Sequence, residues 1–241
     1  MKYDLHIHSC LSPCGDSDMT PNNIAGMVML SGIRLAALTD HNSTLNCPAF
    51  FKACENVGVV PIAGMELTTA EEIHMVCLFP TLDSAMDFGD FISNNRMKIP
   101  NRPDIFGEQL IMNENDEIIG REDSLLITAS DLDIISAFNE VMSRGGAAFP
   151  AHIDKNANGI ISILGDFPPE PGFKAAEFHD MGKSEEYINK YPNLNGLHLL
   201  NASDAHYLTS MLVEAPNLHV EDSDDDNDVR SRVISYLRGE S

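Results

Sequence analysis

Apolar runs and amphipathic segments alternate along the chain and predict a repeated strand–helix unit. Residues 3–7, 33–41 and 59–66 are short apolar runs typical of buried strands. Residues 21–31 and 48–57 lie between them and carry helix signals, because each begins with a proline and is followed by a glycine. Helices that connect strands in this way imply a parallel sheet or a barrel.

The same alternation continues toward the carboxyl end. Further strands are expected at 73–79, 147–152, 173–179 and 196–206, and further helices at 82–93, 132–146 and 229–239. The chain of 241 residues is 43% hydrophobic and can bury a large core. We therefore expect an α/β fold in a single domain that spans residues 1–241, since this length fits one α/β barrel.

One stretch, Ile99 to Thr128, departs from the strand–helix rhythm. Its sequence "GEQLIMNENDEIIGRED" has the alternation and the turn residues of a β-hairpin. We interpret residues 99–128 as an insertion that forms a lid near the barrel mouth. The alternative is a surface hairpin with no part in the site.

The formal charge of −22 and the pI near 4.5 limit the partners that the chain can bind. A negative field repels nucleic-acid backbones and acidic membranes, so stable nucleic-acid binding is not expected. A small substrate is easier to accommodate. The acidic run 221–228 is interpreted as a solvated loop before the last helix.

Targeting signals and cysteine content suggest a cytoplasmic protein. No apolar run approaches the length of about 20 residues that a membrane helix needs, and Met1 to Leu11 lacks the pattern of a signal peptide. Five cysteines without a secretion signal are interpreted as reduced thiols. No membrane partner is expected, and the oligomeric state is not predicted.

Two histidines, His6 and His8, stand one residue apart in the first apolar run. Successive side chains of a strand point to opposite faces, so these imidazoles point the same way and can hold one metal ion. The spacing alone also occurs among structural histidines. Later predicted strands end in further metal-ligand residue types, namely Asp40, His41, Glu66, His152, Asp204 and His206. Strand ends meet at one mouth in a βα barrel, so these side chains are expected to converge.

Such a convergence favours a metal centre over a buried polar network. Crowded imidazoles and carboxylates carry desolvation and like-charge costs that divalent cations offset. Nitrogen and oxygen ligands suit Zn²⁺, Mn²⁺ or Fe²⁺. Asp40 is expected either to orient a ligand imidazole or to cap a loop.

An ordered set of short motifs extends from residue 4 to about residue 207. "HIHS" stands near the amino terminus, "TDH" and "GME" follow the next two predicted strands, "EIH" comes just beyond, and "PAH" and "SDAH" come later. Together these motifs resemble the PHP family, the polymerase and histidinol phosphatase superfamily. The resemblance implies a distorted (β/α)7 barrel with a site for two or three divalent metal ions.

The resemblance also implies a set of ligands. A first ion would be held by His6, His8, Glu66 and Asp204. Glu66 would bridge to a second ion held by His74 and His152, and a third ion would take Asp16, His41 and His206. His74 begins a predicted strand rather than ending one, so the residue pattern alone does not select it.

Asp16 is chosen from several candidates. The family places an acid or a histidine soon after the first histidine, where this chain has Pro13. Counting back from the Thr-Pro pair that begins the next helix selects Asp16 instead. Cys14, Cys10 and Asp18 remain alternatives, and a thiolate at Cys14 would favour zinc or iron.

The activity implied is hydrolysis of a phosphomonoester of a small metabolite or nucleotide by hydroxide from a metal-activated water. The residues expected to carry catalysis are Glu66, Asp204 and His179, the last as a proton donor to the leaving alcohol. His179 is also a candidate for binding the substrate, and Arg96 and Arg102 are candidates because they lie in or near the predicted insertion and can fork onto phosphate.

Two other functions remain open. An exonuclease that acts on short oligonucleotides would use the same chemistry, although the chain has no Trp and only 7% aromatic residues for stacking on bases. A noncatalytic metal-binding module would be expected to lack some ligands, whereas nearly all ligand positions are filled here.

Overall fold

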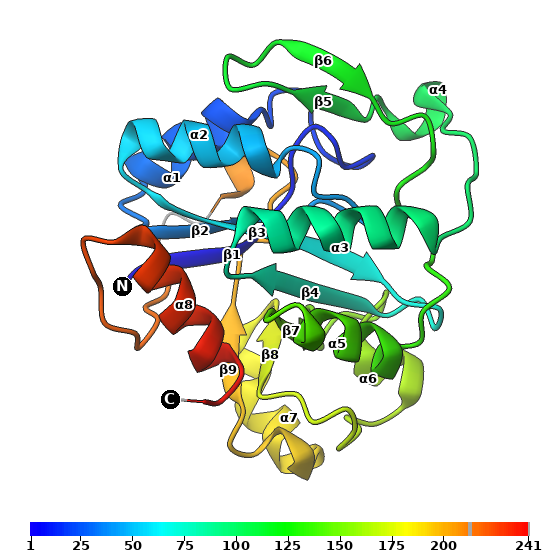
Figure 1. The fold of residues 1–241 in the computed structure, drawn as a ribbon. Helices are drawn as coiled ribbons and strands as arrows, with labels where there is room; N and C mark the ends of the chain where they lie inside the picture. Colours follow the sequence, from blue (N-terminus) through cyan, green and yellow to red (C-terminus); the bar gives the residue numbers. More distant parts are fainter. Residues whose placement is uncertain (212–213, 241) are drawn as a thin grey trace.

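The computed structural model describes residues 1–211 and 214–240, and its strands curl into a barrel-like sheet (Figure 1). Five strands are hydrogen-bonded in the order β1-β2-β3-β4-β7. Their bounds are β1 Tyr3–Ile7, β2 Leu35–Leu38, β3 Val60–Thr68, β4 His74–Phe79 and β7 Ala147–Pro150. Two further strands, β8 (Ala175–Phe178) and β9 (His198–Asn201), form a parallel pair. The expected α/β class and barrel-like sheet are confirmed.

Backbone hydrogen bonds connect the five-stranded sheet to this pair on both sides. The N–H of Ile153, just after β7, donates to the C=O of Glu177 in β8 at 2.8 Å. The N–H of His8, just after β1, donates to the C=O of Ala205, beyond β9, at 3.0 Å. The segments that follow β1, β7 and β9 therefore gather at one edge of the curled sheet.

Strand β4 departs from the parallel order that the strand–helix repeat predicts. β1, β2 and β3 are parallel, whereas β4 is antiparallel to both β3 and β7. A turn connects β3 to β4, and in it the N–H of Thr69 donates to the C=O of Ile73 at 2.9 Å. The amino end of β4 consequently lies beside the carboxyl end of β3, with His74 opposite Thr68.

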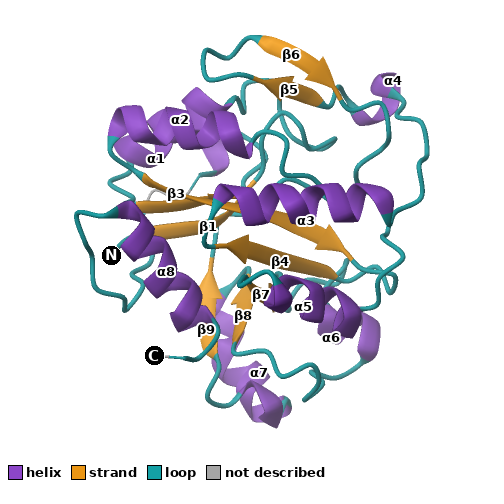
Figure 2. Ribbon diagram, in the orientation of Figure 1, coloured by secondary structure: helices purple, strands orange, loops and turns teal. Residues whose placement is uncertain are grey.

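Helices lie on the outside of the curled sheet (Figure 2). The longer ones are α1 Pro21–Leu30, α2 Cys47–Val57, α3 Leu82–Asn94, α5 Ile134–Ser143 and α8 Asp226–Leu237. The short ones are α4 Pro103–Phe106, α6 Ile160–Leu164 and α7 Ser184–Lys190, with 3₁₀ turns at Met181–Lys183, Pro192–Leu194 and Leu208–Ser210. Thr20 caps α1 by accepting the N–H of Asn23, and Gly58 ends α2 with a φ of +73°.

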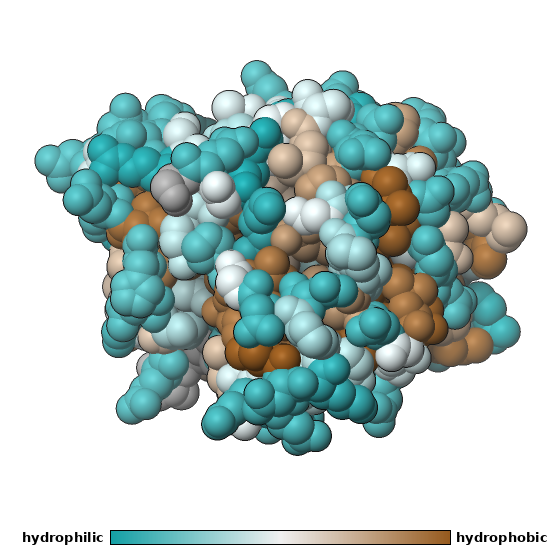
Figure 3. All heavy atoms as spheres, turned by 90° about the horizontal axis from the view of Figure 1, so that it is seen from below, coloured by the Kyte–Doolittle hydropathy of each residue, from teal (hydrophilic) through white to brown (hydrophobic). Residues whose placement is uncertain are grey.

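Two apolar clusters hold these layers together. In the larger one, strand residues pack against α1, α2, α3 and α5, with Phe50 and Phe88 fully buried. In the smaller one, strand residues such as Leu35 and Phe149 pack against Val233 of α8. Burial of apolar surface in both clusters stabilises the fold. On the face seen from below, hydrophobic patches are separated by hydrophilic residues (Figure 3).

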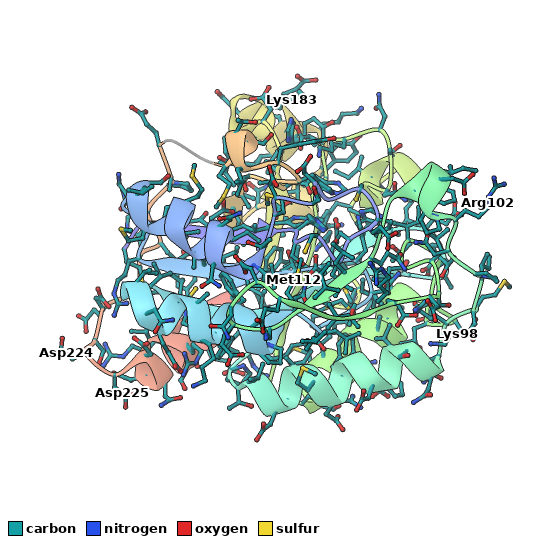
Figure 4. All side chains as sticks on the ribbon, turned by 90° about the horizontal axis from the view of Figure 1, so that it is seen from above. Lys98, Arg102, Met112, Lys183, Asp224 and Asp225 are labelled. Carbon is teal, nitrogen blue, oxygen red and sulfur yellow. The ribbon has the colours of Figure 1, made fainter. Side chains whose placement is uncertain are left out.

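The acidic run 221–228 is only partly the solvated loop that its composition suggests. Helix α8 already begins at Asp226, and the side chain of Asp225 caps it by accepting the N–H of Asn227. Asp226 and Asp228 occupy the first turn, where negative charge is favourable beside the helix N-terminus. Asp224 and Asp225 lie at the edge of the molecule in Figure 4.

Residues 99–128 contain α4 and a two-stranded antiparallel sheet, β5 (Leu110–Met112) and β6 (Ile118–Arg121), which lies at the top of Figure 1. Buried Asn46 joins this hairpin to the barrel: its side-chain amide donates to the C=O of Leu110 at 3.0 Å and accepts the N–H of Met112 at 2.9 Å. The single-domain organisation and the role of residues 99–128 as an insertion or lid stay predictions.

Candidate metal centre

Histidines and acids from several strands meet at the edge where the strand ends gather. His6 lies in β1 and His8 just beyond it, Glu66 lies in β3, and the others follow a strand end or, for His74, begin one. His41 follows β2, His152 follows β7, and Asp204 and His206 follow β9. His74 joins them because β4 runs antiparallel, so that its first residue lies at the same edge as the last residues of β3.

The first group of donors surrounds a single point. The Nε2 atoms of His6 and His8 are 3.1 Å apart. Glu66 Oε1 lies 3.3 Å from Nε2 of His6, and Glu66 Oε2 lies 3.2 Å from Nε2 of His8. Asp204 Oδ1 lies 3.6 Å and 3.3 Å from the same two nitrogens. Donors bound to one ion at about 2.0–2.2 Å have separations of this size, so these four residues fit a divalent cation.

Glu66 connects this group to a second one. Its Oε1 lies 2.8 Å from Nδ1 of His74 and 3.1 Å from Nε2 of His152. Its Oε2 lies 3.1 Å from Nδ1 of His41 without hydrogen-bond geometry, and that nitrogen has no hydrogen-bond partner among the described residues. A buried carboxylate that faces imidazole nitrogens in this way suits a bridge between metal ions.

A third group consists of His8, His41 and His206, whose ligand atoms also lie close together. The rings of His8 and His206 are stacked with their centroids 4.1 Å apart, and those of His8 and His41 are 4.6 Å apart. His8 thus belongs to two of the three groups. The third set of ligands that the family resemblance implies contains Asp16 in place of His8.

Asp16 lies near this centre, but its carboxylate is not in these groups. Its backbone N–H donates to the C=O of His206 at 2.9 Å, and its carboxylate accepts the N–H of Asp18. The alternatives differ in exposure: Cys10 is buried, whereas Cys14 and Asp18 are exposed. Asp16 as a ligand stays a prediction.

Hydrogen bonds behind the imidazoles set their tautomers. Nδ1 of His6 lies 3.0 Å from both oxygens of Glu177 and donates to that carboxylate. Ser12 donates its hydroxyl proton to Asp40 at 2.7 Å, so its oxygen accepts the Nδ1 proton of His8 at 2.9 Å. Both histidines therefore direct an Nε2 lone pair toward Glu66, which is the arrangement that a metal ion requires.

Asp40 fulfils both roles considered for it. Its carboxylate accepts the backbone N–H of Ser9 at 2.7 Å and the Ser9 hydroxyl at 2.6 Å, which holds the loop after β1. Through Ser12 it also orients His8. Glu177 was missed as a site residue because it lies within β8 rather than at its end; the available signal was a carboxylate inside the buried run "AAEF".

The electrostatics of the cluster favour added positive charge. Although burial opposes the charged imidazolium, the carboxylates of Glu177, Glu66 and Asp204 raise the pKa of His6 well above its ordinary value. In the same way, hydrogen bonds to Asp204 and Glu66 outweigh burial and raise the pKa of His8 to about 9. Burial also opposes ionisation of Glu66, yet its imidazole neighbours hold its pKa well below the usual range. A bound cation would supply this charge in place of protons.

For His41 and His206, in contrast to His6 and His8, burial prevails and lowers the pKa of the imidazole. It lowers the pKa of His206 to about 4 and that of His41 well below its ordinary value, with the charge of neighbouring His8 adding to the effect. Neutral imidazoles are the form that binds metal ions. His41 and His206 are therefore ready to act as ligands near neutral pH.

Two residues of the cluster have unusual backbone conformations. His152 has a φ of +28° and Asp204 a φ of +49°. L-residues rarely adopt positive φ values because of steric crowding, and such strain gathers at functional sites. The hydrogen bond from the His152 N–H to Glu177 at 3.1 Å helps to hold the first of them.

The cluster opens into a cavity of about 180 Å³, here called the metal pocket, which is lined by His41, His74, His152, Asp204, His206 and Lys155, among others. Lys155 follows β7 in the loop after His152, and its Nζ donates to Asp204 Oδ2 at 2.6 Å. Its side chain is about one-third exposed. Lys155 is not among the residues predicted for the site, because its loop has no regular pattern.

The other expected site residues are not among those that line the metal pocket. His179 is exposed just after β8, where its N–H donates to Asp154 at 2.7 Å. Arg96 is buried and donates to the C=O of Leu125 at 3.0 Å, which joins 99–128 to the end of α3. Arg102 is exposed beside Asp104 and points outward from the edge of the molecule (Figure 4). Catalytic or substrate-binding roles for these three residues stay predictions.

Sequence comparison identifies the family. The PHP domain matches residues 4–166, which is more than half of the chain of 241 residues. The chain therefore belongs to the PHP domain family, whose members are metal-dependent hydrolases. The 5'-3' exoribonuclease of Haemophilus influenzae is 34% identical over 80 residues, which cover 32% of this chain and 28% of that relative.

Comparison with solved structures gives the same fold. The lesion-specific endonuclease PfuEndoQ of Pyrococcus furiosus has a TM-score of 0.64 at 18% identity; the match covers 100% of this chain and 56% of that one. A proposed metal-dependent phosphoesterase of Bifidobacterium adolescentis has a TM-score of 0.60 at 16% identity, covering 98% and 96%. An amidohydrolase of Chromobacterium violaceum has a TM-score of 0.59 at 18% identity, covering 90% and 92%.

Within residues 1–211 and 214–240, each helix is too short or too polar to cross a bilayer.

Proposed function

We propose that this protein is a metal-dependent phosphoesterase that hydrolyses a phosphomonoester of a small metabolite or nucleotide. The observation that carries the proposal is the position of Glu66, whose two oxygens face donors of adjoining groups at 2.8–3.3 Å within one pocket. Adjacent ion sites of this kind suit in-line displacement at phosphorus. The donor set fits two or three ions of Zn, Mn or Fe.

Bound divalent ions supply an activated water and neutralise phosphate oxygens. In the net reaction, the water oxygen forms the new bond to phosphorus, the bond to the ester oxygen breaks, and the leaving alcohol takes up a proton. Glu66 and Asp204 hold the ions, while Glu177 and Ser12 fix the ligand imidazoles.

The ammonium group of Lys155 adds a positive charge at the proposed position of the phosphate. Its Nζ contacts Asp204 at 2.6 Å and lines the metal pocket. When Asp204 binds an ion, this ammonium group is positioned to donate to a phosphate oxygen in the same pocket. The proposed role of Lys155 is therefore to bind the substrate.

An exonuclease acting on short oligonucleotides is the second candidate. The local similarity to the exoribonuclease of Haemophilus influenzae favours it. The charge of −22 opposes it, because each further phosphate of a polynucleotide is repelled. A noncatalytic metal-binding module is a weaker candidate, since the three donor groups are filled.

The five cysteines form no disulfide, which suits a reducing compartment, and we propose a cytoplasmic location.

Metal analysis combined with phosphate release on one sample tests the function. The panel contains glycerol phosphate, nucleoside monophosphates and short oligonucleotides. Two or three metal ions per chain with release from monoesters support the phosphatase, whereas preference for oligonucleotides supports the exonuclease. Protein that stays inactive after supply of Mn²⁺, Zn²⁺ or Fe²⁺ contradicts both enzymes.

A further inference from the structure

A second cavity of about 550 Å³ opens beside the metal pocket, and it is here called the side cavity. It lies between the loop 10–17, helix α4 and Tyr207. We propose that the side cavity binds the nucleoside of a nucleoside monophosphate while its phosphate occupies the metal pocket. This inference rests on the proposed phosphoesterase function and names its substrate class.

Residues that are neighbours in the chain line the two cavities. His206 lines the metal pocket, and the next residue, Tyr207, lines the side cavity. Asp16, which also lines the side cavity, donates its backbone N–H to the C=O of His206 at 2.9 Å. The proposal therefore places the leaving group of a phosphoester held in the metal pocket across this boundary, in the side cavity.

The volumes of the two cavities suit a phosphate in the metal pocket and a nucleoside in the side cavity. Pockets for small organic ligands usually have volumes of about 300–1,000 Å³. The side cavity, at about 550 Å³, lies in this range, whereas the metal pocket, at about 180 Å³, is below it and suits a phosphate group. A leaving group of nucleoside size would therefore extend beyond the metal pocket.

Three apolar side chains that line the side cavity, Tyr207, Ile105 and Phe106, lie outside the apolar clusters. Tyr207 and Ile105 are 54% and 57% exposed, and Phe106 is half-buried. Among the described residues, neither aromatic ring forms a ring pair or belongs to an apolar cluster. Free aromatic faces of this kind stack on bases irrespective of base type.

The charges of the side cavity exclude a second phosphate. Asp16 and Glu108 line it, and no Lys or Arg is found among the described residues of its wall. Acidic groups accept hydrogen bonds from sugar hydroxyls and base amino groups, but they repel anions. Arg121 donates to the Glu108 carboxylate at 2.6 Å and does not line the side cavity. The lining thus favours a nucleoside monophosphate over a bisphosphate or an oligonucleotide.

Adenosine tests this assignment without catalysis, because it carries no phosphate. We expect chelator-treated protein to bind adenosine in a calorimetric titration. Phe106→Ala should weaken binding about tenfold, the value of one base–aromatic stack, and Phe106→Tyr should retain it. Ile119→Ala is the matched control, because Ile119 is 64% exposed on β6 and does not line the side cavity.

In the metal-loaded enzyme, Phe106→Ala should lower kcat/KM about tenfold for AMP and leave that for glycerol phosphate unchanged. Absence of adenosine binding, or equal binding by Phe106→Ala and wild type, overturns the proposal. If glycerol phosphate is hydrolysed while adenosine does not bind, only the side-cavity assignment fails. If adenosine binds through Phe106 but no phosphomonoester is hydrolysed, the nucleoside site stands and the phosphoesterase function fails.

Discussion

Glu177 contacts His6 with both carboxylate oxygens, each 3.0 Å from Nδ1 of the imidazole. The two residues are 171 positions apart in the chain, and both are buried. The contact fixes the side of the ring on which the proton lies, so that Nε2 presents its lone pair to Glu66 and Asp204. A residue that does not touch the proposed ion therefore orients one that does.

Replacing Glu177 should weaken metal binding without removing a ligand. Glu177→Gln loses the negative charge behind His6, and we expect metal affinity to fall about 10–100-fold, as for other outer-shell partners. Competition with a chelator measures the affinity. Glu185→Gln, an exposed change in the first turn of α7, should have no effect. An unchanged affinity in Glu177→Gln would contradict the orienting role.

Removing Glu66 should have a larger effect. Glu66→Ala deletes the carboxylate shared by the donor groups, so bound metal should decrease and activity should fall by more than about a hundredfold. Metal content and phosphate release are the measurements, and circular dichroism should show that the fold persists. Glu55→Gln on the surface of α2 is the control. Wild-type turnover in Glu66→Ala would refute the site.

Lys155→Gln should affect the substrate rather than the metal. The lost ammonium group can no longer donate to phosphate, and we expect kcat/KM for phosphomonoesters to fall about tenfold to a hundredfold, the worth of one charged hydrogen bond. Metal content should stay at the wild-type value. Lys52→Gln, exposed on α2, serves as the control. Normal kinetics in Lys155→Gln would remove this residue from the proposed site.

The carboxylate of Asp154 is expected to stabilise the folded protein in a pH-dependent way. Burial opposes its ionisation, but the N–H groups of His179 and Asp180 and the ammonium group of Lys183 outweigh it and lower the pKa below the ordinary 3.8. The charged form is therefore favoured in the folded protein. Its contribution is fully present at neutral pH and is lost as the pH falls below about 4.

Asp154→Asn should thus reduce the free energy of unfolding by about 1–3 kcal/mol at pH 7, and the difference from wild type should narrow below pH ~4. Urea unfolding in the presence of chelator measures this difference without linkage to metal binding. Asp104→Asn at an exposed ion pair should have little effect at either pH. A difference that does not vary with pH would refute the assignment.

Much of the centre could be predicted because most of its residues follow buried strands. His41, His152 and His206 each come after an apolar run, and a barrel brings such ends together. The pattern did not select His74, because the reversed direction of β4 depends on how three strands pair. Only the family resemblance pointed to it.

Other residues depended on tertiary structure that the chain does not display locally. Arg96 is predicted to bind substrate because it is basic and near the hairpin, and this role stays a prediction; the sequence does not show that its guanidinium donates to a backbone carbonyl. Lys155 contacts Asp204 and Ser12 contacts His8 from irregular loops, where no periodic pattern indicates the direction of a side chain. For Asp16, the sequence indicated the neighbourhood of His206 but not the direction of its carboxylate.

The short turn between β3 and β4 limits which insertions the chain can accept without loss of a ligand. Side chains of a strand alternate between faces, so one residue inserted between Thr69 and Ile73 would shift β4 by one position relative to β3. The imidazole of His74 would then turn away from Glu66, and the side chain of Ile73 would take its place. The turn between β3 and β4 contributes no side chain to the donor groups described, yet its length is constrained as tightly as the identity of the ligands.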